Sequence, residues 1–166
     1  MRTPPSPPAA VADPGVPVLS GGPGFRNRQV AWWCATLGAL TGLLMGLWSF
    51  DGPVPVPAWL GDYGSTARRL ARLGHIAFFG LAILNLLLAG ELDRVRRPRP
   101  AHRLASVAMN FGNVGLPRVL FGAAAWMPLK YLLPIPALAV TLALLLTGLT
   151  LWPSRNPPPV SHENPG

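Results

Sequence analysis

Residues 29–50 read QVAWWCATLGALTGLLMGLWSF, which is 22 consecutive residues without a charged side chain. At about 1.5 Å of rise per residue, a helix of this length crosses the hydrocarbon core of a bilayer. Tryptophans stand toward both ends of the stretch, where their amphipathic rings prefer the interface between membrane and water. The stretch therefore predicts a transmembrane helix.

Three further segments extend this pattern. Residues 131–152 form another uncharged span of 22 residues, and residues 73–90 form one of 18 that is preceded by arginines able to snorkel. Residues 104–127 are uncharged except for Arg118 and contain Pro117, which predicts a kinked helix, with a re-entrant pair of half-helices as the alternative. We expect an all-α integral membrane protein, an antiparallel bundle of four transmembrane helices at about 29–50, 67–91, 104–127 and 131–152.

The composition supports a membrane protein with unstructured ends. Of the 166 residues, 50% are hydrophobic and 12% are charged, against roughly 25% charged in an average soluble domain. Cys34 is the only cysteine, which excludes a disulfide scaffold. Residues 1–28 and 153–166 are rich in proline and lack an apolar period, so we expect disordered tails around a helical domain at 29–152.

The net charge of +8 indicates lipid headgroups rather than nucleic acid, because the basic residues lie beside the apolar spans. With four crossings, nine arginines share the side of the two termini and the 94–103 loop. The other side has four basic residues, Arg68, Arg69, Arg72 and Lys130. The positive-inside rule then places both termini in the cytoplasm. The preference for Arg, Pro and Gly suggests a GC-rich bacterial gene, and hence the bacterial cytoplasmic (inner) membrane.

Residues for catalysis and cofactor binding are scarce. The sequence has no CxxCH, HExxH or GxSxG motif, and the two 22-residue spans contain no carboxylate for acid–base chemistry. Among the histidines only His75 lies within a span, which disfavours a haem held by two histidines. A His75–Met45 pair in the outer half of the bundle is the remaining arrangement for haem or copper. We predict no catalytic residue and no cofactor.

A polar stripe marks the second and third helices. If their hairpin turns near residues 97 and 98, Asn85 lies level with Asn110. The helical period places four residues of the third helix on one face, Ser106, Asn110, Asn113 and Pro117. The first interpretation is hydrogen bonding between helices, in which Asn85 and Asn110 set the register at about 0.6 kcal/mol per contact.

The second interpretation of the stripe is a small polar pocket. His75, Asn113 and Arg118 would line it and accept an anionic or carbonyl-bearing group, such as a quinone or a lipid phosphate. Arg118 favours this pocket, because a buried guanidinium needs an acceptor and no carboxylate lies within the spans. The competing expectation is that Arg118 snorkels toward Asp51 or a lipid headgroup.

Gly38, Gly42 and Gly46 recur every four residues and form a smooth helix face. We favour packing inside the chain's own bundle over a face for another subunit or a second copy. The leading functional hypothesis is a non-catalytic subunit or assembly partner of a larger membrane complex. The rival is a redox or ligand-binding protein that uses His75 with Met45 or Arg118. A third hypothesis, an oligomeric transporter or channel, needs more polar residues than one chain provides.

Overall fold

The computed structural model describes residues 21–49, 52–95 and 99–151, which form helices and connecting turns with no β-strand among them. This confirms the all-α class for the described part of the chain. The elements in chain order are α1 (Phe25–Leu47), η1 (Ala58–Leu60), α2 (Thr66–Arg94), α3 (Pro100–Ala125), η2 (Met127–Leu132) and α4 (Pro134–Leu151).

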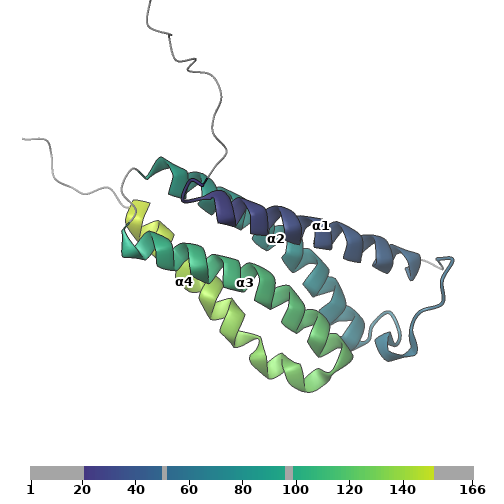
Figure 1. Ribbon diagram of the computed structural model, residues 1–166. Helices are drawn as coiled ribbons and strands as arrows, with labels where there is room; N and C mark the ends of the chain where they lie inside the picture. The colour runs from purple at the N-terminus through teal and green to yellow at the C-terminus, as the bar shows by residue number, and fades with distance from the viewer. Residues whose placement is uncertain (1–20, 50–51, 96–98, 152–166) are drawn as a thin grey trace, which may run out of the picture.

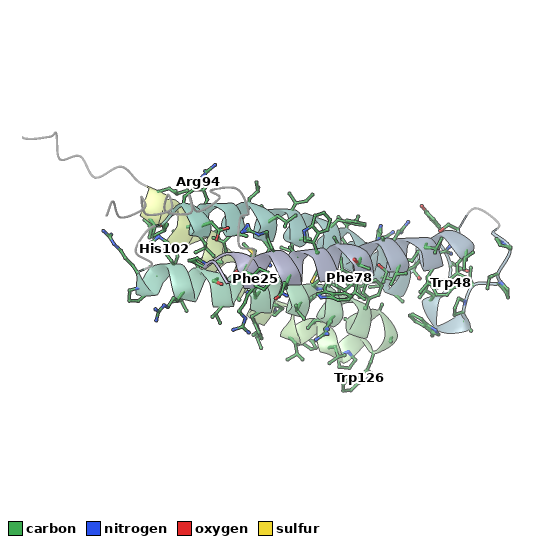
Figure 2. The ribbon with its side chains drawn as sticks, turned by 45° about the horizontal axis from the view of Figure 1, so that its top comes forward. Phe25, Trp48, Phe78, Arg94, His102 and Trp126 are labelled. Carbon is green, nitrogen blue, oxygen red and sulfur yellow. The ribbon has the colours of Figure 1, made fainter. Side chains whose placement is uncertain are left out.

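The α-helices pack with neighbours antiparallel (Figure 1). α2 packs against α1 and α3, and α3 also packs against α4 and α1. One end, called the arginine end, is where α1 and α3 begin and α2 and α4 finish; the other is called the tryptophan end. Figure 2 shows Arg94 and His102 at the first, with Trp48 and Trp126 toward the second.

Three segments are long and apolar enough to cross a membrane, namely Phe25–Leu47, Thr66–Arg94 and Met127–Leu151. α3 is not one of these three. It contacts each of the other α-helices, and its buried residues include Asn113 and Pro117. Protein surrounds much of α3, so its lower apolar content is compatible with a place inside the bundle.

α1 begins at Phe25, four residues before the expected start, and ends at Leu47. The prediction that the unstructured tail reaches residue 28 is therefore wrong for residues 25–28. Arg26 and Arg28 lie in the first turns of α1 despite their charge, because long arginine side chains can still reach polar surroundings from there. Residues 1–20 and 152–166, which hold most of the predicted tails, lie outside the described residues.

α3 begins at Pro100, where the missing N–H of proline costs nothing in a first turn. The backbone N–H of Arg99 donates to Nδ1 of His102 at 3.1 Å, which ties the residue before the helix to its first turn. α3 continues through Pro117 as one helix, so the re-entrant alternative of two half-helices is wrong. The helix η2 forms the connection to α4, which begins at Pro134 and not at the expected residue 131.

Candidate functional site

Side chains from three helices form a closed hydrogen-bonded ring near the arginine end. Nδ2 of Asn27 in α1 donates to Oδ1 of Asn85 in α2 at 2.7 Å, and Nδ2 of Asn85 donates to Oδ1 of Asn110 in α3 at 2.9 Å. Nδ2 of Asn110 closes the ring on Oδ1 of Asn27 at 3.4 Å, and Ser106 Oγ donates to that same oxygen. Asn27 and Asn85 are completely buried. We call these four residues the amide ring.

The bond between Asn85 and Asn110 is the one expected from the hairpin of the second and third helices. Sequence reasoning missed Asn27, because the helix containing it was expected to begin at residue 29. The available signal was an amide between two arginines, just before an apolar span and level with the other two amides. The ring joins α1, α2 and α3, whereas the predicted pair joined only two of them.

Asp93 anchors the start of α1 to the end of α2. Its carboxylate accepts the backbone N–H of Gly24 at 2.9 Å and the guanidinium of Arg28, so a negative charge lies at the positive end of the α1 dipole. A Cβ on Gly24 would lie 2.2 Å from the carbonyl oxygen of Ala89. Only glycine permits this approach, which places the first turn of α1 beside the amide ring.

His75 is held against α1. Its Nδ1 lies 2.9 Å from the carbonyl oxygen of Gly38 and 3.4 Å from Oγ1 of Thr41. Because a carbonyl oxygen can only accept, Nδ1 is assigned as the protonated nitrogen. This bond fixes the imidazole ring to the backbone of α1 rather than to α3.

The glycine stripe packs inside the bundle. A Cβ on Gly42 would lie 2.5 Å from Cε1 of His75, and one on Gly38 would lie 3.1 Å from the ring of Phe79. A Cβ on Gly46 would meet nothing within 4 Å. α2 therefore covers Gly38 and Gly42, and these two glycines offer no face to another subunit.

Asn113 is completely buried, and neither Nδ2 nor Oδ1 of its side chain has a partner among the described residues. Its backbone carbonyl also lacks the usual helical donor, because Pro117, four residues on, has no N–H. Sγ of Cys34 in α1 donates to this carbonyl at 3.8 Å. A neighbouring helix thus supplies the donor that the proline removes, which gives Cys34 a role beyond filling space.

The three residues of the predicted polar pocket do not come together. Arg118 is exposed on the outer surface of α3, while Asn113 is buried and His75 is bonded to α1. Arg118 lies five positions after Asn113, and at about 100° per residue the two side chains point about 140° apart around the helix. No hydrogen bond in the described part of the chain joins any two of the three.

Met45 lies in an apolar setting. With Thr41, Trp59 and Phe121 it lines a cavity of about 200 Å³ near the tryptophan end. Within residues 21–49, 52–95 and 99–151, no group of three His, Cys, Asp or Glu residues is placed to hold a metal ion.

Comparison of the chain with protein-family models, with curated proteins and with solved structures finds no match.

Proposed function

We propose that this chain is a four-span protein of the bacterial cytoplasmic membrane, with both termini in the cytoplasm. Three apolar segments of sufficient length support this, and α3 would be the fourth span, shielded by its neighbours. The arginine end contains Arg26, Arg28, Arg94, Arg99 and Arg103 among the described residues, and the positive-inside rule places such an end on the cytoplasmic side.

Reporter fusions test this topology. A phosphatase that is active only outside the cytoplasm, fused after Gly61, should be active, and the same enzyme fused after Pro98 should be inactive. Fusion of a fluorescent protein that matures only in the cytoplasm should give the opposite pattern. An active phosphatase at both positions would show that α2 does not cross the membrane.

We further propose that the protein is a non-catalytic subunit that binds another membrane protein through α3. The supporting observation is an exposed surface of α3, called the α3 stripe, formed by Leu104, Val107, Phe111 and Arg118. Their spacings of three, four and seven residues place them along one line of the helix. No described residue makes a hydrogen bond or ion pair with the Arg118 guanidinium.

Arg118 lies seven residues before the end of α3, which is about 10 Å along the helix axis. Arg118 would therefore lie deeper in the membrane than Trp126 and Tyr131, whose exposed rings suit the interface between membrane and water. An arginine facing lipid costs about 2.5–3.5 kcal/mol at the centre of the membrane on insertion scales, and less at the shallower depth of Arg118. A carboxylate on a partner helix would remove this cost and would give the contact its specificity.

A second copy of this chain does not fit this surface. In a symmetric dimer of parallel chains joined by the α3 stripe, the two Arg118 residues would lie at equal depth and repel each other. Of the described acidic residues, Glu91 and Asp93 lie at the arginine end of α2, more than two helical turns away in depth, and Asp62 lies outside the helices in the connection before α2. The chemistry of the stripe thus favours a different protein with an intramembrane Asp or Glu.

Photo-crosslinking in native membranes tests this proposal. With a photoreactive side chain at Phe111, we expect one discrete adduct, and R118L should reduce its yield at least tenfold. The same group at Ile83, which is similarly exposed on α2, is the matched control and should give no such adduct. Once the captured protein is identified, the charges of the contact can be exchanged. R118E in this chain, combined with an Asp→Arg or Glu→Arg change in the captured protein, should restore the yield of the adduct.

Stability of the purified variant separates binding from folding. Because Arg118 has no partner among the described residues, R118L should leave the melting temperature unchanged or raise it. A lower melting temperature together with an unchanged adduct would show that Arg118 supports the fold and not a partner.

A further inference from the structure

At the tryptophan end, a half-open cavity of about 660 Å³ is bordered by residues of the 52–65 connection together with Trp48 and Arg68. This volume lies within the range of about 300–1,000 Å³ that is typical of small-molecule sites. Trp48, Val54, Pro55, Val56 and Tyr63 supply most of the wall, and Arg68 supplies the charge. The cavity lies at the opposite end of the bundle from the amide ring.

Arg68 is unusual for a cation, because only 8% of its surface is exposed. Its Nη2 donates to the backbone carbonyl of Trp48 at 2.7 Å, and its guanidinium carbon lies 5.1 Å from the centre of the Tyr63 ring. A guanidinium has five N–H donors, and this is its one hydrogen bond within the described residues. Neither of the two salt bridges formed there involves Arg68.

Tyr63 also contacts a second arginine, Arg72. The guanidinium of Arg72 lies 4.4 Å from the centre of the same ring and donates to the Tyr63 carbonyl at 3.2 Å. Arg72 does not line the cavity, so the two arginines that contact Tyr63 differ in access to it. Substitution of Arg72 is therefore a matched control for substitution of Arg68.

We propose that this cavity binds an oxyanion attached to an apolar body, with Arg68 as the residue that grips the oxyanion. Carboxylate and phosphate groups match the planar fork of a guanidinium. The apolar wall of Val54, Pro55 and Val56 would receive the rest of the ligand. Two sources share this chemistry, the headgroup of an anionic phospholipid and a small soluble carboxylate. This site does not depend on the partner proposed for the α3 stripe.

Calorimetric titration of the full-length protein in neutral detergent tests the proposal with three probes. These are dihexanoyl phosphatidylglycerol, hexanoate and inorganic phosphate. We expect saturable binding of one ligand per chain for the lipid, for hexanoate or for both, and at least tenfold weaker binding of inorganic phosphate. Binding of the lipid alone assigns a headgroup, whereas comparable binding of hexanoate assigns a soluble carboxylate.

Variants assign the binding to Arg68. R68Q should weaken binding at least tenfold, while R72Q should change it less than threefold. V56E keeps Arg68 but places a carboxylate in the cavity wall, which should repel the oxyanion and abolish binding. V56Q adds a side chain of similar size without the charge and should retain more of the binding. The V56 pair keeps the test decisive if R68Q does not fold.

Three results would overturn the proposal. One is the absence of saturable binding for both amphipathic probes. Another is an equal loss of binding in R68Q and R72Q. The third concerns Asp51, which is close in sequence and lies outside the described residues. If only D51N binds the probes, Asp51 neutralises Arg68 within the chain, and the cavity is not a ligand site in the native protein.

Discussion

Asn85→Leu should lower the free energy of unfolding by about 2–4 kcal/mol. The substitution removes two bonds between helices, one to Asn27 and one to Asn110. Such contacts average about 0.6 kcal/mol in membrane proteins and reach about 1.7. It also leaves a buried donor on Asn27 without its partner, and stranded groups of this kind cost about 1–3 kcal/mol each. Unfolding by SDS titration in mixed micelles, followed by circular dichroism, measures the change.

Because the amide ring is closed, substitutions of two of its residues should not have additive effects on stability. The double variant N85L/N110L should be less destabilised than the sum of its two single variants, because both substitutions disrupt the same bond. Thr141→Val is the matched control, since Thr141 is exposed on α4 and bonds only within its own helix. It should change stability by less than about 0.5 kcal/mol. Additive single effects would mean that the three amides do not act as a unit.

Gly112→Ala should destabilise the protein by about 1–3 kcal/mol, because α3 and α4 would have to move apart. A Cβ on Gly112 would lie 2.3 Å from Cγ2 of Val140 and 3.1 Å from the backbone oxygen of Pro136. The Val140 side chain can rotate away, but the α4 backbone cannot yield without shifting the helix. The same unfolding titration measures this loss.

Gly80→Ala is the matched control for this prediction. A Cβ at Gly80 in α2 would meet nothing within 4 Å, so the higher helix propensity of alanine should stabilise the protein by about 0.5–1 kcal/mol. The two changes are chemically identical and should have opposite signs. A stabilising effect at Gly112 would show that α3 and α4 are less closely packed than the structure has them.

Hydrophobic runs along the chain were sufficient to predict the helical class and the approximate position of each helix. This works because a helix satisfies its own backbone hydrogen bonds, so local composition and length carry most of the information. The ends were less predictable. The start of α1 depends on the carboxylate of Asp93, which lies 69 residues away in sequence from Gly24.

Depth along a hairpin was also predictable from the sequence, and it led to the Asn85–Asn110 contact. The direction in which each side chain points around its helix was harder to predict from the sequence. Arg118 and His75 were expected to line one pocket, yet the first faces outward from α3 and the second faces α1. Their polar character therefore suggested a pocket that the helix rotations do not form.

The sequence by itself thus determined the helical class, the approximate helix positions and one contact between helices, because these follow from local periodicity and chain length. Only the tertiary structure brought Asn27 into the amide ring and Cys34 to the carbonyl that Pro117 leaves free. It alone buried Arg68 in contact with Trp48 and Tyr63. These contacts join residues far apart in the chain, and they depend on how each helix is rotated against its neighbours, which hydrophobic patterning constrains only loosely.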